Sequence, residues 1–133
     1  MWRRALRFFP LLLTVACSGD VVIPPSPVLG SFGGRGTELV ATVDSVRVKF
    51  VCSFASFRQP IIPEGDGHFS LAPVLMPTKT GPAAISIKGV ISPTRIDFEA
   101  VSLSPEGEVR TSQHVVHRDQ PGDYSGMGCL EDQ

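Results

Sequence analysis

Apolar and polar residues alternate along most of this chain, with the period of two expected for β-strands that bury one face. Val46, Val48 and Phe50 share one face, whereas Arg47 and Lys49 point to the other. The same alternation predicts strands over residues 37–43, 46–52, 68–75, 83–91, 96–100 and 109–117, with a further short segment over 54–58. No segment shows sustained helical periodicity, so the chain is predicted to be all-β.

Short turn signals separate these segments. Asp66-Gly67 is typical of a hairpin turn, and Ser92-Pro93-Thr94 and residues 104–107 are further turns. Pro73 marks its strand as an edge or bulged strand, and Gly89 marks a bend or a bulge. We therefore predict a small antiparallel meander of six to seven strands, closed into a barrel or folded into a sandwich. The meander order and the domain size favour the barrel.

The N-terminus has the charge pattern of an export signal. Arg3, Arg4 and Arg7 precede an apolar segment over residues 8–16. That segment is shorter than the roughly 20 apolar residues that a membrane-spanning helix needs. A positive start followed by a short apolar run is typical of a signal peptide.

The end of this segment, residues 11–17, resembles the lipobox of bacterial lipoproteins, in which the cysteine becomes the lipidated first residue. Ala16 and Cys17 match that motif, and Thr14 stands where leucine is usual. The resemblance implies a membrane anchor at Cys17. Ser18 in place of aspartate implies the outer membrane of a bacterial envelope, facing the periplasm or the surface. The alternative is cleavage after Ala16 without a lipid.

These signals divide the chain into three parts. They are a signal peptide (1–16), a lipidated cysteine with a flexible linker (17–35) and a β-domain (36–133). Proline and glycine dominate the linker and favour extended, flexible backbone. Phe32 is expected to be its first fixed contact with the domain.

The charge balance argues against a nucleic-acid partner. The whole chain has 12 basic and 13 acidic residues and a net charge of −1. The signal peptide holds three of the basic residues, which leaves nine basic against 13 acidic residues and a mature net charge of −4. Nucleic-acid binding needs a basic patch, and none is present.

Three cysteines are an odd number for an exported protein, which requires an explanation. Lipidation of Cys17 removes one and leaves Cys52 and Cys129. An oxidising periplasm favours their pairing as a disulfide. The alternative is two free buried thiols.

Four short motifs carry a resemblance to known proteins. They are Val48 to Cys52, Gln59-Pro60-Ile61, Asp66 to Phe69, and Gly128-Cys129-Leu130. Together, over residues 34–130, they resemble a group of small secreted bacterial lipoproteins of uncharacterised function. Such proteins often place tryptophan where this chain has Phe32. The resemblance implies a β-rich secreted domain with a Cys52–Cys129 bond, and it implies no activity.

No motif of the chain points to a metal, a cofactor or an activated nucleophile. His114 and His117 are three apart, which places them on opposite faces of a strand, and His68 stands alone. The segment around Ser125 does not match the turn that exposes a nucleophilic serine. We therefore predict a protein that is not an enzyme and that has no metal or cofactor.

Asp97 and Glu99 are the alternative to this interpretation. They share one face of a predicted strand, and their spacing along it is about 6.6 Å. Paired carboxylates at about 5–10 Å cleave glycosidic bonds in hydrolases. An envelope hydrolase using Asp97 and Glu99 therefore stands beside the simpler interpretation, the solvent face of a half-buried strand.

The aromatic residues leave two roles open. Five phenylalanines either line a cavity in the barrel or fill its core; they are Phe50, Phe54, Phe57, Phe69 and Phe98. A cavity would take a small apolar ligand, whereas the face of Arg47 and Lys49 would suit a protein partner. The sequence thus predicts a lipid-anchored, non-enzymatic binding or interaction module, or a purely structural envelope protein.

Overall fold

The computed structural model describes residues 26–128, which form eight strands and no helix. The strands are β1 (Gly30–Gly34), β2 (Thr37–Ala41), β3 (Val46–Lys49), β4 (Phe54–Phe57), β5 (His68–Met76), β6 (Ala83–Ser92), β7 (Arg95–Leu103) and β8 (Val109–Arg118). The predicted signal peptide, Cys17 and Cys129 lie outside the described residues. Because the described part has no helix, it also has no helical segment able to cross a membrane.

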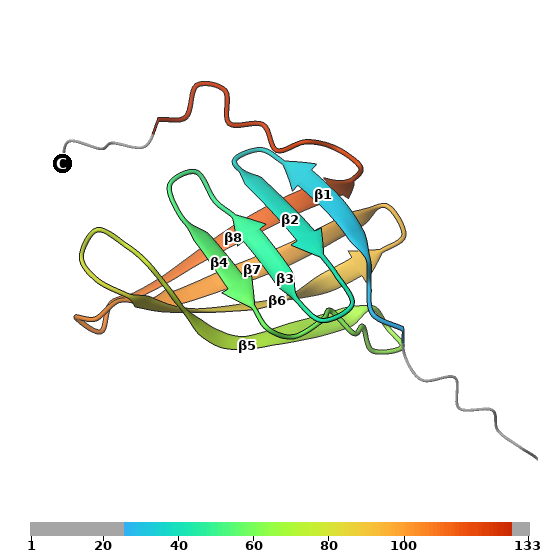
Figure 1. Cartoon of the computed structure of the whole chain (residues 1–133), viewed down its shortest axis with the longest axis horizontal. Coiled ribbons are helices and arrows are strands. Elements are labelled where there is room, and N and C mark those ends of the chain that lie inside the picture. The colour runs from blue at the N-terminus through green and yellow to red at the C-terminus, as the bar shows by residue number, and fades with distance from the viewer. Residues whose placement is uncertain (1–25, 129–133) are drawn as a thin grey trace, which may run out of the picture.

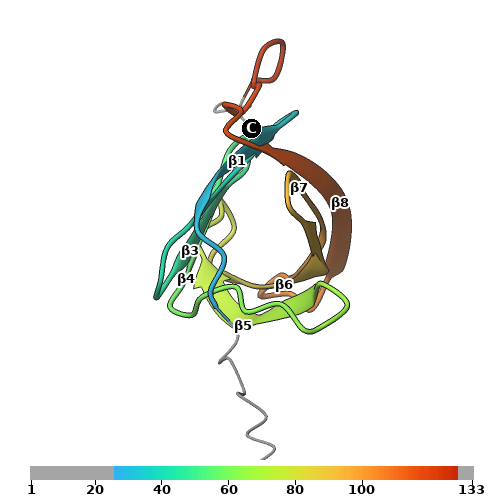
Figure 2. The same ribbon diagram turned by 90° about the vertical axis from the view of Figure 1, so that its right-hand side faces the viewer.

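All eight strands belong to one antiparallel sheet with the order β4-β3-β2-β1-β8-β7-β6-β5. Strands that are neighbours in sequence pair with each other, except β4 and β5, and β1 also pairs with β8 and so joins the two halves. The sheet curls into a nearly closed barrel (Figures 1 and 2). The predicted all-β barrel class is therefore confirmed, with eight strands in place of six or seven.

The seam of the barrel lies between β4 and β5, the two ends of the sheet order. The side chain of Gln59 spans part of it. Its Nε2 donates to the carbonyl of Ser70 at 3.3 Å, and its Oε1 accepts from the amide of Ala72 at 2.9 Å. A side-chain amide thus takes the place of backbone pairing where the two edge strands are not paired.

The eighth strand is β1, which lies inside the segment predicted as a flexible linker over 17–35. That linker boundary is wrong, because Gly33 and Gly34 serve close packing. A Cβ on Gly34 would lie 2.1 Å from the carbonyl oxygen of Val115, and one on Gly33 would lie 2.2 Å from that of Gln120. The glycines let β8 and the chain after it approach β1, so the barrel begins before residue 36.

The structure has a bulge at only one of the two predicted interruptions, Pro73 and Gly89. The register of β5 against β6 shifts between Leu71 and Val74, which confirms Pro73 as a residue of a bulged edge strand. Gly89 shows no register shift against β7, so no bulge occurs there. A Cβ on Gly89 would lie 2.3 Å from the carbonyl oxygen of Asp97, so this glycine permits close packing instead.

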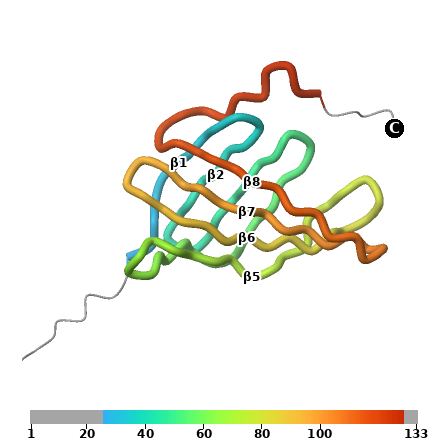
Figure 3. Tube along the Cα trace, turned by 180° about the vertical axis from the view of Figure 1, so that it is seen from behind, coloured from blue at the N-terminus to red at the C-terminus, as the bar shows by residue number. Residues whose placement is uncertain are grey.

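The core fills most of the barrel interior with side chains from every strand. Figure 3 shows β5, β6, β7 and β8 side by side as one half of the wall. Fully buried side chains include Phe32, Leu39, Val46, Val48, Phe57, Ile61, Ile96 and Val116. Ile61 comes from the loop between β4 and β5, where its carbonyl accepts from the amide of Val28 at 2.8 Å. This loop adds a buried apolar side chain that no strand supplies.

Candidate functional site at the open end of the barrel

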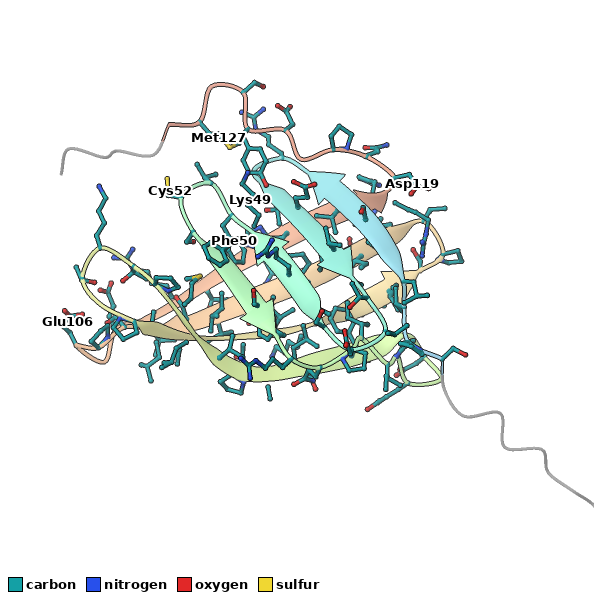
Figure 4. The ribbon with its side chains drawn as sticks, viewed as in Figure 1. Lys49, Phe50, Cys52, Glu106, Asp119 and Met127 are labelled. Atoms are coloured by element: carbon teal, nitrogen blue, oxygen red, sulfur yellow. The ribbon has the colours of Figure 1, made fainter. Side chains whose placement is uncertain are left out.

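The two ends of the barrel differ in what covers them. The connections β3–β4, β5–β6 and β7–β8 meet at one end, on the left in Figure 1. Figure 4 labels Phe50 and Cys52 from the first of these connections and Glu106 from the last. We call this end, with the cavity described next, the mouth. The opposite end is covered by the β4–β5 loop that buries Ile61.

The mouth contains a cavity of about 360 Å³. Its apolar lining is Phe50, Met76, Ile85 and Ala100, and its polar lining is Ser53, Ser102, Arg110, Thr111 and Ser112. The strand β8 contributes only polar residues to this lining, and β5 and β6 contribute only apolar ones. The strand β7 contributes one of each, Ala100 opposite Ser112 and Ser102 opposite Arg110. We call the polar lining residues the polar wall and the apolar ones the apolar wall.

A wider outer hollow of about 560 Å³ lies next to this cavity and shares Met76, Ser102 and Arg110 with it. Charged side chains of both signs line it, including Lys79, Glu106 and Glu108. The Arg110 guanidinium contacts Glu108 with an Nε–Oε1 distance of 3.3 Å, and both side chains are mostly exposed. A water-exposed pair of this kind contributes little to stability.

A hydrogen-bonded series of three side chains runs from the polar wall into the barrel. Thr37 Oγ1 and His114 Nδ1 lie 2.8 Å apart, and His114 Nε2 and Ser112 Oγ lie 2.7 Å apart. Thr37 is buried and has 1% of its surface exposed, whereas Ser112 is exposed. The three residues connect the buried interior of the barrel to the cavity.

The imidazole of His114 is held between two aromatic rings. It stacks on Phe98 with centroids 5.0 Å apart, and its centroid is 5.2 Å from the tilted ring of Phe50. Burial lowers the pKa of His114 below its ordinary value of 6.5, because desolvation disfavours the charged imidazole. At neutral pH the ring is therefore neutral, with one nitrogen as donor and the other as acceptor.

The two carboxylates of the hydrolase hypothesis lie away from the mouth, on the outer face of β7. They border an open hollow of about 450 Å³ that also includes His68 and Lys88. Asp97 forms two hydrogen bonds of 2.7 Å with Arg95, which lower the pKa of its carboxyl. Glu99 accepts from the amide of Gln113 at 3.1 Å. The lowered pKa of Asp97 is the opposite of the raised pKa that a general acid needs.

The five phenylalanines separate into three groups. Phe57, Phe69 and Phe98 are buried in the core, Phe50 lines the cavity, and Phe54 lies on the outside with 49% of its surface exposed. Phe54 stacks under Arg47, whose guanidinium carbon lies 5.7 Å from the ring centroid. Most of these aromatic rings therefore fill the barrel, and the cavity occupies only its mouth.

The predicted positions of two histidines on opposite faces agree with the structure. His114 points into the barrel and His117 is exposed. Residues 26–128 contain no cluster of three or more histidine, cysteine, aspartate or glutamate side chains arranged to hold a metal. Cys52 lies in the connection after β3, beside the mouth.

Sequence reasoning missed the set of Thr37, Ser112 and His114. It considered His114 only as a metal ligand together with His117, whereas the ring is half-buried between Phe50 and Phe98. The signal was present in the spacing, because residues i and i+2 of a strand share a face. The contribution of Thr37 was not visible, since it lies 77 residues away from His114 in sequence.

Comparison of the chain with protein-family models, with curated proteins and with solved structures returned no match.

Proposed function

We propose that this chain is a lipid-anchored bacterial envelope protein whose barrel binds a small amphipathic molecule at its mouth, without catalysis. The observation that carries the proposal is the division of the cavity into one apolar and one polar wall. Small-molecule sites are concave, mostly apolar and equipped with a few convergent polar groups, and they occur in the mouths of β-barrels. The volume of about 360 Å³ suits a small ligand.

The binding proposal is tested by filling the cavity. Ser102 lies in the mouth, above the buried core, so Ser102→Trp blocks the cavity with little disturbance of the packing below. We expect the purified mature chain to bind an apolar fluorescent dye with one site, and Ser102→Trp to weaken binding at least about tenfold. The control is Val115→Trp, because Val115 is exposed on the outer face of β8. Absence of dye binding, or equal binding by both variants, contradicts the proposal.

The membrane anchor is a separate part of the proposal and rests on the lipobox resemblance at Cys17. A single lipid chain gives weak membrane binding, and stable anchoring takes more than one chain. We expect Cys17→Ser to release the protein from membranes of the producing cell. A wild-type chain that neither sediments with membranes nor incorporates a labelled fatty acid would exclude the anchor.

We also propose the Cys52–Cys129 disulfide, which would tie the C-terminal segment to the mouth. Val51, which precedes Cys52, and Met127, two residues before Cys129, both lie near Gly36: a Cβ there would lie 3.0 Å from the Met127 sulfur and 3.3 Å from Val51. Figure 4 shows Cys52 and Met127 at the same end of the barrel. Mass analysis without reduction should show two hydrogens fewer than the reduced chain, and two alkylatable thiols would refute the bond.

A further inference from the structure

We propose that the mouth selects an acyl-chain carboxylic acid, with the carboxylate received by hydrogen-bond donors of Ser112 and Arg110 and the chain packed against the apolar wall. This inference rests on the proposed binding function and specifies the chemical class of its ligand. It follows from the direction in which hydrogen bonds run through the three side chains Thr37, His114 and Ser112.

The donor-to-acceptor direction of these hydrogen bonds is set at Thr37, the buried end of the series. Among the described residues, the hydroxyl of Thr37 has the Nδ1 of His114 as its one side-chain partner. If Thr37 accepted a hydrogen from the ring, its own hydroxyl hydrogen would be buried without an acceptor, which is unfavourable. Thr37 therefore donates to Nδ1.

The remaining assignments follow from the chemistry of a neutral imidazole. A ring that accepts at Nδ1 has its hydrogen on Nε2, so His114 donates to Ser112 Oγ across 2.7 Å. The stacking of His114 on Phe98 holds the ring in this orientation. Ser112 accepts from the ring, and its own hydroxyl hydrogen remains to be donated to a group in the cavity that it lines.

Arg110 adds a second donor to the same wall. A guanidinium has five N–H donors and no acceptor, and among the described residues only its Nε has a hydrogen-bond partner, the carboxylate of Glu108. Both Arg110 and Ser112 line the cavity. Two donors, one of them cationic, match an anionic oxygen ligand and disfavour an ammonium group.

The apolar wall defines the rest of the ligand. The side chains of Phe50, Met76, Ile85 and Ala100 are apolar, which favours a hydrocarbon part. The flexible thioether of Met76 adapts to irregular apolar shapes. A molecule with a carboxylate at one end and a short hydrocarbon chain at the other satisfies both walls.

The test compares octanoate with octylamine, which has the same chain and a head group of opposite charge. We expect calorimetry on the whole mature chain to show octanoate binding at least about tenfold tighter than octylamine. Ser112→Ala should weaken octanoate about tenfold. The control Ser86→Ala removes a serine hydroxyl from the outer face of β6, away from the cavity lining, and it should change the affinity by less than about twofold.

A second measurement does not depend on any variant. Nitrogen NMR of the wild-type protein should show His114 protonated on Nε2, and protonation on Nδ1 would overturn the proposed direction. If both probes bind equally and Ser112→Ala has no effect, the carboxylate inference fails and the binding function stands. If neither probe nor an apolar dye binds, both fail.

Discussion

The covered and the open end of the barrel show how one meander combines a stable core with a site. At the covered end, the loop between β4 and β5 inserts Ile61, and the side chains around it are fully buried. At the mouth, serines and an arginine take the inward positions of β7 and β8, and a cavity remains. The difference indicates that the apolar packing is densest at one end, whereas the other end holds the cavity of the proposed binding site.

The largest expected effect tests the covered half directly. Phe57 is fully buried, so Phe57→Ala should lower the free energy of unfolding by about 3–5 kcal/mol. Phe54 on the same strand is half exposed and supplies the control, with a loss below about 1 kcal/mol for Phe54→Ala. Chemical denaturation measures both. Equal losses would mean that the core does not lie where the burial pattern places it.

The next effect concerns the close packing of β1 against β8 near the mouth. Gly34 lies against the backbone of Val115, so Gly34→Ala must push β8 away from β1. We expect a loss of about 1–3 kcal/mol in the free energy of unfolding. Gly65→Ala is the matched change, because a Cβ there meets nothing within 4 Å. An unchanged Gly34→Ala variant would show that β1 is not packed as described.

The same glycines explain what the sequence predicted and what it did not. Alternation identified the strands with large side chains, such as Val46 to Lys49 and Ile96 to Ala100, since burial of one face leaves a visible period. The strand β1 was assigned to a linker, because Gly33 and Gly34 have no side chain to show a period. Their role depends on β8, and a contact so distant in sequence leaves no local signal.

The candidate site could not be predicted from the sequence for a related reason. Inward-facing Ser102, Arg110 and Ser112 resemble the polar side of a half-buried strand, and the sequence places no boundary between core and cavity along β7 and β8. The cavity arises because these residues meet Phe50 and Met76 from distant strands. Carboxylates at Asp97 and Glu99 were easier to notice, but the barrel turns them outward.

A smaller expected effect is a pH dependence of the free energy of unfolding that arises at His114 in the mouth. Burial lowers the pKa of His114 in the folded state, so the unfolded chain binds more protons just below pH 6.5. Stability should therefore decrease as pH falls through about 6.5, until the folded-state pKa is passed. The side chains that contact the ring, Phe50, Phe98, Thr37 and Ser112, carry no charge.

Substitution of His114 and of His117 in turn shows which of them causes this pH dependence. His114→Gln should reduce the dependence of the unfolding free energy on pH between about pH 5 and 7. His117→Gln should leave that dependence in place, because His117 is exposed on the outer face of β8. If His117→Gln alone removes the dependence, the burial of His114 is not its source.

The smallest effect concerns the outer face. Asp97 and Arg95 are about half exposed, so Asp97→Asn should change stability by no more than about 1 kcal/mol. On the binding account it should also leave ligand affinity at the mouth unchanged. A measurable glycosidase activity that disappears with Asp97→Asn or Glu99→Gln would favour the hydrolase hypothesis instead.

The most direct test of the central claim is an amide NMR titration of the mature chain with octanoate. Binding at the mouth predicts shifts concentrated at Ser53, Met76, Ser102 and Ser112, with little change at Phe57 and Ile61 at the covered end. Saturation with one site would agree with a single cavity. Shifts centred on the covered end or on the outer face of Asp97 and Glu99 would contradict the account.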